Sequence, residues 1–377
     1  MRNNSVAFSE RSEYAYGIMS ERSENITAPS PRVTLQHVAA LTGLGRTTVS
    51  DILNRDAASK YSKETRSLVY RAVKESGYTP ARAAQQLARG RSGQIGLMLM
   101  RDFANPYFAR IADAVERELR ERGYRLQLAL TDGNPETERA RILQMQSDRV
   151  EGLIVGPVYE TLDLEQHKNL WQGNIPLVLF GSNLAAGFDE VTLNMSAGVS
   201  TSFELLIQRG HRKIGALAIP PSRLQPDQPN PNNEFVTIAK RLGVYAPEWF
   251  EWQQDTGRFE DSHAAAVRFA RRWKLADPAN RPTAMVCLND QVAMTALSAF
   301  HQEGIRCPDD ISLIGHDNLP EGAYLVPALT TIDNHVELQM KQSVERLLER
   351  INNPDAPRRV YTVQPTLVER QSVRDLR

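Results

Sequence analysis

The stretch "VTLQHVAALTGLGRTTVSDILN", residues 33–54, predicts two short helices joined by a tight turn. Its apolar residues Val38, Leu44, Val49 and Leu53 recur at helical spacing. Two glycines between the helical segments permit a sharp change of chain direction. This pattern is typical of a helix-turn-helix, in which the second helix crosses the first.

A third helix is expected to follow and to complete a small core. Ser62 is a good N-cap, and the stretch "KETRSLVYRAVKES" after it carries Leu68, Val69 and Val73, which we expect to face inward. Gly77 then provides the residue on which helices commonly end. We therefore assign residues 32–79 to an all-α helix-turn-helix domain.

The charge of the chain is divided unevenly, although its net charge is zero. Residues 32–94 hold 11 Lys and Arg against 4 Asp and Glu, a net charge of +7, whereas residues 95–377 carry −6. A basic module beside an acidic one indicates a polyanionic partner for the basic part. The alternative, a three-helix bundle whose charges are only solvated, is disfavoured by this division.

The second helix of a helix-turn-helix presents its first residues to base edges in the DNA major groove. Here Arg46 can make a bidentate contact with guanine, and Thr47 and Thr48 offer hydroxyl and methyl groups. Thr34 and Ser50 can hold phosphate oxygens. The expected partner of this domain is double-stranded DNA.

The segment "PARAAQQLARGRS", residues 80–92, contains one large apolar residue, Leu87, among Ala, Gln and Arg. Minor-groove proteins drive such an apolar wedge between base steps and kink the duplex. The alternative is a linker helix whose Leu packs on a neighbour. We assign residues 80–93 to a hinge helix, with Arg82, Ala83, Ala84, Gln85 and Leu87 as its expected DNA contacts.

From residue 94 onward, short apolar runs alternate with amphipathic stretches, which predicts parallel sheets covered by helices. Between the first two runs, Ile111, Val115 and Leu119 lie at four-residue spacing on one helical face. About 280 residues are too many for one such sheet, so we expect a two-lobed α/β core. The expected lobes are lobe 1, about 94–191 and 334–360, and lobe 2, about 192–333 and 361–377.

Ligands of open parallel sheets bind beyond the carboxyl ends of the strands. Polar and aromatic side chains follow several of the expected strands, and their carboxylate and amide groups suit the hydroxyls of a sugar or another small polar molecule. Asp290 is more simply read as a helix N-cap. The candidate effector contacts are Asp102, Asn105, Phe108, Ser182, Phe259, Asn289 and Asp317.

Three stretches, "VTLQHVAALTGLGRTTVSDILN", "GYTPARAAQQLARGRSGQIGLM" and "PDDISLIGHDN…PALTTI", resemble the lac repressor family of bacterial transcription regulators. The resemblance covers all but the N-terminal tail. It implies a homodimer that reads a palindromic operator, a hinge helix that folds in the minor groove, and a core like periplasmic sugar-binding proteins. Matched by motif, it implies DNA contacts at Arg46, Thr47, Thr48, Ser50, Asn54, Ala83, Ala84 and Leu87, and effector contacts at Phe108, Phe259, Asn289 and Asp317.

The sequence departs from the family pattern at four places, one of which is Ala81, where relatives commonly have a hinge Asn. Asp51 stands where relatives often have a basic or neutral residue, so the carboxylate must accept a hydrogen bond, for example from cytosine, or pair with Arg55. Pro231 and Gly181 stand where relatives have polar groups that hold the effector. The effector is therefore an unusual sugar, another small polar molecule, or absent.

Other classes of protein are disfavoured. Residues 1–31 lack periodicity and an apolar core segment, so we expect a disordered tail rather than a signal peptide, and a cytoplasmic protein without a membrane span. Neither the two cysteines nor the seven histidines have metal-binding spacing, so we expect no metal and no cofactor. A free-standing solute-binding module and an α/β enzyme remain the alternatives, with His316 beside Asp317 as the one catalytic-looking pair.

Overall fold

A computed structural model describes residues 33–53, 58–78, 91–100, 103–157, 175–181, 187–220, 231–253 and 258–377. The chain divides into two compact units, Met1–Arg91 and Ser92–Arg377, which we treat separately. Several expected features lie outside the described residues, namely the tail, most of the hinge with Arg82, Ala83, Ala84, Gln85 and Leu87, and the single positions Asn54, Asp102 and Ser182.

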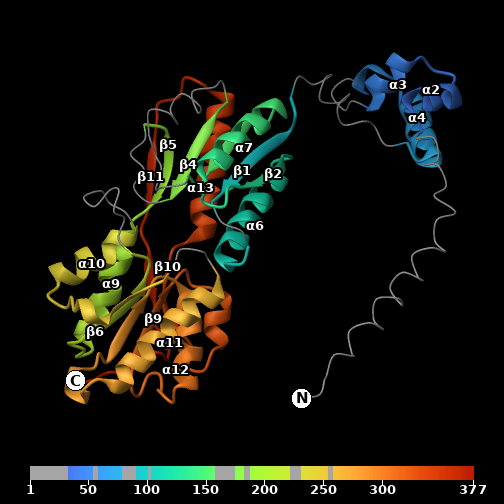
Figure 1. Ribbon diagram of the computed structural model, residues 1–377. Coiled ribbons are helices and arrows are strands. Elements are labelled where there is room, and N and C mark those ends of the chain that lie inside the picture. The colour runs from blue at the N-terminus through green and yellow to red at the C-terminus, as the bar shows by residue number, and fades with distance from the viewer. Residues whose placement is uncertain are drawn as a thin grey trace, which may run out of the picture. The chain divides into compact units, whose positions relative to one another are not determined.

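The first unit contains the three expected helices, α2 (Leu35–Thr42), α3 (Arg46–Leu53) and α4 (Lys63–Ser76), with a 3-10 turn, η1 (Ala58–Lys60), before α4 (Figure 1). Val38, Val49, Ile52 and Val69 are fully buried between the helices and form its core. The helix-turn-helix pattern of the sequence is confirmed by this arrangement.

The ends of α4 follow the expected local chemistry. The Ser62 hydroxyl accepts the backbone N–H of Thr65 at 3.2 Å, and Gly77 ends the helix at a φ of 67°. The expectation that Leu68 faces inward was wrong, because 42% of this residue is exposed. The buried stripe runs instead through Val69 and Ala72, and Leu68 lies on the flank of that stripe.

The second unit contains two six-stranded sheets, one in each lobe. The first has the order β11-β5-β4-β3-β1-β2, and all its strand pairs are parallel. The second has the order β12-β10-β9-β8-β6-β7, and only its edge strand β12 is antiparallel. The first sheet comprises β1 (Gln94–Leu99), β2 (Arg125–Leu130), β3 (Gly152–Val155), β4 (Leu177–Gly181), β5 (Asp189–Leu193) and β11 (Val360–Val363). The second comprises β6 (Ile214–Ala218), β7 (Phe250–Trp252), β8 (Ala284–Cys287), β9 (Ser312–His316), β10 (Thr330–Asp333) and β12 (Thr366–Val368).

Helices cover both faces of each sheet, as Figure 1 shows. On the first sheet, α6 (Pro106–Glu121) and α13 (Val336–Asn352) share one face and α7 (Pro135–Ser147) covers the other. On the second, α11 (Phe259–Leu275) and α12 (Asp290–Gln302) share one face, and α9 (Met195–Gln208) and α10 (Pro231–Arg241) the other. Short 3-10 turns are η3 (Pro247–Trp249), η4 (Pro278–Asn280) and η5 (Pro320–Tyr324). Among the described helices, none is long and apolar enough to cross a membrane.

The hydrophobic stripe expected on α6 is confirmed, since Ile111, Val115 and Leu119 are all fully buried. The chain leaves the first sheet after Leu193 and again after Val363, a few residues beyond the boundaries that the sequence suggested. Helix α13 begins after β10 of the second lobe but belongs to the first lobe, where it packs on α6. The two lobes are thus tied by three chain crossings.

A buried ion-pair cluster fastens the last helix to the first sheet. The Asp189 carboxylate, at the start of β5, lies 2.8 Å from Arg346 and 2.9 Å from Arg350 of α13, and it accepts the backbone N–H of Arg359 at 2.9 Å. Burial alone would raise the pKa of Asp189, but the hydrogen bonds from Arg350, Arg346 and Arg359 lower it overall. The cluster therefore requires an ionised Asp189.

We predict that Asp189→Asn destabilises the core by about 3 kcal/mol, because it removes the charge that Arg346 and Arg350 share and leaves Arg346 only its more exposed pair with Glu349. Since the pKa of Asp189 is lowered in the folded state, its stabilising contribution should be present above about pH 4 and lost as the pH falls. Urea unfolding of wild type and variant at pH 7 and pH 3 measures both effects. The control, Asp113→Asn, removes an exposed partner of Arg117 and should change stability by less than about 1 kcal/mol. Equal losses in the two variants would contradict the prediction.

Candidate nucleic-acid and effector sites

The second helix of the first unit presents polar side chains to solvent. Arg46, Thr47 and Ser50 of α3 are exposed and Thr48 is half-buried, while Val49 on the opposite face is fully buried. The apolar face fixes the helix on its own core, so the polar face is left for a ligand. These four are the described residues for which the sequence predicted DNA contacts in this helix.

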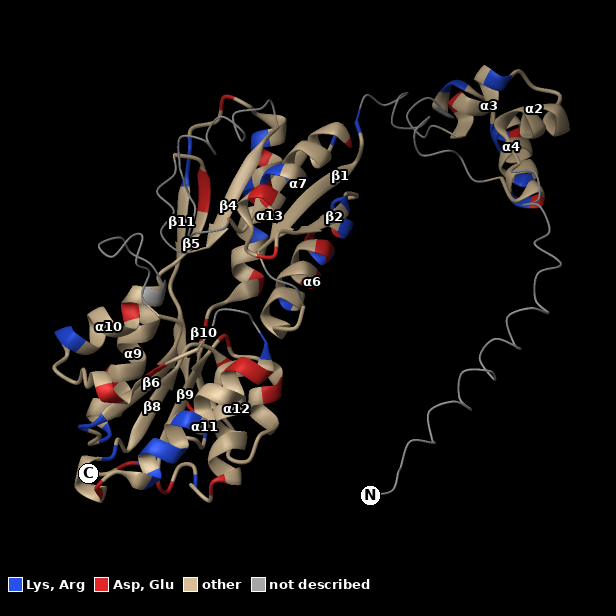
Figure 2. Cartoon of the chain, viewed as in Figure 1, with Lys and Arg blue, Asp and Glu red and all other residues tan. Residues whose placement is uncertain are grey.

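Basic side chains lie on the neighbouring helix. Lys63, Arg71 and Lys74 of α4 are exposed, and Figure 2 shows basic residues along this helix. Thr34 is exposed at the start of α2, where its hydroxyl lies 2.9 Å from the ring Nδ1 of His37. A surface of exposed Lys, Arg and hydroxyl groups has the chemistry that phosphate oxygens require.

In the second unit, two candidate effector residues begin helices at the carboxyl ends of strands. Asn105 accepts the backbone N–H of Tyr107 at 3.0 Å and caps α6. Asn289 accepts the backbone N–H of Val292 at 2.9 Å and caps α12. The expectation that Asp290 is the cap was wrong, because Asn289 takes that position and leaves the Asp290 carboxylate to make other contacts.

Asp317 follows β9 in an unusual backbone conformation. Asp317 and Asn318 have φ values of 106° and 49°, a region that side chains other than glycine seldom occupy. The turn is held by the Asp317 amide, which donates to the Ile332 carbonyl at 2.8 Å, and by Asn334, which donates to the Asp317 carboxylate at 2.8 Å. Backbone strain of this kind costs about 1–3 kcal/mol per residue and is concentrated at functional sites.

A second buried carboxylate, Asp290, lies beneath this turn. It accepts the backbone N–H of Leu319 at 2.7 Å and the Thr331 hydroxyl at 2.5 Å. Burial raises the pKa of Asp290 to about 7, although its hydrogen bonds to Thr331 and Leu319 oppose the rise. Burial, and then the charge of Asp290, also raise the pKa of Asp317 well above its usual range. The two carboxylates therefore favour a neighbour that donates hydrogen bonds or carries positive charge.

One arginine joins this turn to the opposite lobe. Arg110, on α6 of the first lobe, donates to the backbone carbonyls of Asp317 at 2.9 Å and Asn318 at 3.0 Å. Its other nitrogen donates to both carboxylate oxygens of Glu337 on α13, at 3.0 and 3.2 Å. Since Asn105 and Phe108 lie on the same helix end as Arg110, the contact brings candidate effector residues of both lobes to one region.

His316, which would pair with Asp317 if the protein were an enzyme, belongs to the core. It is 1% exposed, and its ring nitrogens lie 2.9 Å from the Cys287 carbonyl and 3.2 Å from the Ser202 hydroxyl. Burial lowers the pKa of His316 to about 4, so the ring is neutral at pH 7. These contacts use both ring nitrogens and give the histidine a structural role.

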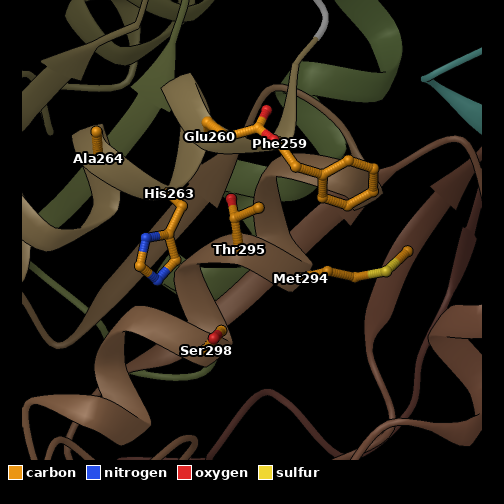
Figure 3. A pocket seen from close by; sticks show the side chains of 7 residues that line it. All are labelled: Phe259, Glu260, His263, Ala264, Met294, Thr295 and Ser298. Atoms are coloured by element: carbon orange, nitrogen blue, oxygen red, sulfur yellow. The ribbon is translucent and has the colours of Figure 1, made fainter. Parts of the chain in front are cut away.

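Phe259 lies at the first turn of α11 and is 40% exposed. It borders a groove of about 440 Å³ between α11 and α12, shown in Figure 3, where Phe259 and Met294 extend in the same direction and His263 lies farther along. An exposed aromatic ring at the start of a helix can stack on a ligand ring. Among the described residues, no group of His, Cys, Asp and Glu could hold a metal ion.

Both units of the chain match known protein families. Residues 34–81 match the family described as "Bacterial regulatory proteins, lacI family", and residues 203–373 match a periplasmic binding protein-like domain. The HTH-type transcriptional repressor PurR of Aliivibrio fischeri is 32% identical over 344 residues, which are 90% of this chain and 98% of that protein. The chain belongs to the lacI family.

Two further relatives extend this result. The PurR repressor of Escherichia coli is 34% identical over 350 residues, covering 91% of this chain and 97% of that protein. The crystal structure of a lac repressor dimer bound to operator and the anti-inducer ONPF matches with a TM-score of 0.76 and 25% identity, over 91% of this chain and all of that one. This lacI-family protein is thus a DNA-binding transcriptional regulator with an effector-binding core.

Sequence reasoning missed three residues that organise the candidate effector site. They are Arg110, Asp290 in its role beneath the turn, and Glu337. Arg110 and Asp317 are 207 positions apart, so no local pattern links them. The available signal was weaker: Arg110 lies two residues after Phe108 and five after Asn105, near the same end of the expected helix.

We predict that Arg110→Ala loosens the turn after β9, because the Asp317 and Asn318 carbonyls then lose the charge-assisted hydrogen bonds that Arg110 donates to them. Such bonds contribute about 1.5–3 kcal/mol each, so backbone amides near Asp317 should exchange with deuterium at least about tenfold faster. Hydrogen-exchange mass spectrometry of peptides covering β9 and the turn measures this change. Arg117→Ala is the matched control, because Arg117 lies on the same helix and pairs with the exposed Asp113 at 3.4 Å, away from the turn after β9. Indistinguishable exchange in the two variants would contradict the assigned role of Arg110.

Proposed function

We propose that this lacI-family protein is a repressor that binds a palindromic operator as a homodimer and is controlled by a small polar effector held between the lobes. The observation that carries the proposal is the combination of a polar, exposed recognition helix with a strained, carboxylate-lined turn that Arg110 ties to the other lobe. It acts in the cytoplasm, on nucleoid DNA, and carries out no catalysis.

The effector is a molecule rich in hydrogen-bond donors. Asp317 provides a carboxylate beside the strained turn, which the fully buried Asp290 supports from beneath through its bonds from Leu319 and Thr331. Phe108 and Phe259 provide aromatic surface at the first turns of α6 and α11. Carboxylates that accept from hydroxyls, together with stacking rings, are the groups with which proteins hold sugars and similar metabolites. Asp102, Ser182 and Asn289 complete the proposed set of contacts, with Asn105.

The mechanism couples two equilibria. The lobes change their arrangement with effector, and Arg110 is the inter-lobe contact that senses the turn carrying Asp317. The hinge helix, residues 80–93, is too short and polar to be stable alone in water, so we expect it to fold with its twin on DNA. An effector that prefers one lobe arrangement then changes operator affinity by its difference in affinity for the two states.

Two observations support the homodimer. The lac repressor matched above is described as a dimer bound to operator. The described surface also exposes large apolar side chains, including Tyr324, which is 86% exposed, and Val326, which is 98% exposed. Such side chains support the homodimer where they join into a contiguous apolar patch, the feature that marks a protein-binding surface.

We predict that Arg46→Ala relaxes the base preference at one position of each half-site and weakens operator binding by about tenfold. The reason is that a bidentate Arg–guanine contact contributes about 1–3 kcal/mol of discrimination. Titration of a selected operator and of its single-base variants measures the change. The control is Lys74→Ala, an exposed α4 residue, which should weaken binding to all sequences alike. A uniform loss in the Arg46 variant as well would make Arg46 a phosphate contact.

We predict that Leu87→Ala lowers specific operator affinity by about tenfold or more and reduces DNA bending, while the dimer stays folded. The physical reason is that an apolar wedge holds the unstacked base step open. Gel mobility of circularly permuted operator fragments measures the bend. Unchanged bending with unchanged specific affinity would remove Leu87 from the proposed minor-groove contacts.

Genome-wide footprinting of the wild-type protein tests the proposed function as a whole. It should recover a palindromic sequence bound with a steep dependence on salt concentration. A solute-binding module or an α/β enzyme would recover no such sequence. The genes beside the recovered sites would then name the metabolites to test as effector.

A further inference from the structure

The recognition helix α3 carries one acidic residue, Asp51, which is half-buried beside the exposed face formed by Arg46, Thr47 and Ser50. The Tyr61 hydroxyl, which follows η1, donates to Oδ2 of Asp51 at 3.0 Å. A carboxylate is thus placed on the surface that meets DNA, although the phosphates of DNA repel it. A hydrogen-bond donor on a base offsets this repulsion.

The bond from Tyr61 fixes one oxygen of the Asp51 carboxylate, Oδ2. Oδ1 has no hydrogen-bond partner among residues 33–53 and 58–78 of the domain. The other nearby phenol, Tyr70, donates instead to the backbone carbonyl of Ile52 at 3.2 Å. The hydrogen bond to Asp51 is also the largest cause of the raised pKa of Tyr61, so this phenol remains protonated and a donor.

An ionised carboxylate can only accept hydrogen bonds. In the major groove, guanine presents two acceptors and thymine one acceptor with a methyl group, so neither can donate to it. Cytosine presents the N4 amino group, and adenine presents its N6 amino group beside the acceptor N7, which repels a carboxylate. Cytosine is therefore the base that best suits Oδ1.

We infer that Asp51, held in position by Tyr61, is a specificity-determining residue that accepts a hydrogen bond from a cytosine amino group at one position of each operator half-site. The inference rests on the proposed operator recognition and adds the base that this chain selects. Asp51 contributes discrimination rather than affinity, because its charge opposes the phosphates while it accepts from one base. Tyr61 acts as a positioning residue, since it donates to the Asp51 carboxylate and is assigned no contact with a base.

The test is selection of binding sites from a random DNA library with full-length protein at one fixed salt concentration. The variants are Asp51→Ala, Asp51→Asn and Tyr61→Phe. The charge-matched control is Glu75→Gln, which removes one exposed carboxylate from α4, away from α3. Thermal unfolding of each variant confirms that the domain remains folded.

Each variant has a distinct expected result. Asp51→Ala should reduce the preference for cytosine at one position per half-site by about fivefold to tenfold and leave the other positions unchanged. Asp51→Asn should move the preferred base at that position to adenine, because an amide can both donate and accept on the edge of adenine. Tyr61→Phe should keep cytosine with a weaker preference, and Glu75→Gln should keep the wild-type sequence.

Three results would overturn the inference. A selected sequence that is identical for wild type, Asp51→Ala and Asp51→Asn would make Asp51 a structural partner of Tyr61 only. Guanine or thymine at the position that responds to Asp51 would contradict the hydrogen-bond assignment. If wild-type protein selects no sequence at all, the proposed function fails and this inference fails with it, whereas the first two results leave the proposed function intact.

Discussion

The effector-binding core depends on the hydrogen bonds that the Arg110 guanidinium donates to the backbone carbonyls of Asp317 and Asn318. Both residues have a positive φ, and a turn in that conformation persists only where surrounding contacts hold it. Arg110 supplies two of those contacts from the other lobe, and Glu337 fixes its orientation through a paired hydrogen bond. The turn that presents Asp317 therefore has its full set of contacts only while the lobes keep this arrangement.

Parallel strand order explains why the polar groups meet. In each sheet the central strands run in one direction, so the ends of β8 and β9 and the helices that follow them lie at the same edge. Asn289 and Asp317 thereby come close without any nearness in sequence. In the function that we propose, an effector in contact with Asp317 changes the free energy of the lobe contact, and reciprocity then requires that DNA binding change effector affinity by the same factor.

Local signals in the sequence predicted much of the fold, but they could not predict features that depend on contacts between residues far apart in the chain. Caps such as Ser62 and the repeated spacing of Ile111, Val115 and Leu119 indicate helices because those patterns involve only near neighbours. The three-residue strands β7 and β12 were not expected, since their pairing is decided by the sheet they join. For the effector site, strand ends pointed to Asp317, but the role of Arg110 depends on a contact across 207 positions.

The central claim is that the turn carrying Asp317 transmits effector binding to the DNA-binding unit. The most direct test measures the operator affinity of full-length wild-type protein and of Asp317→Ala. Each is titrated with and without a panel of mono- and disaccharides and of metabolites handled by the enzymes that adjacent genes encode. We expect at least a fivefold change of wild-type operator affinity with one compound, about 1 kcal/mol of coupling, and no change in the variant, which still binds operator. A variant that responds as strongly as wild type would contradict it.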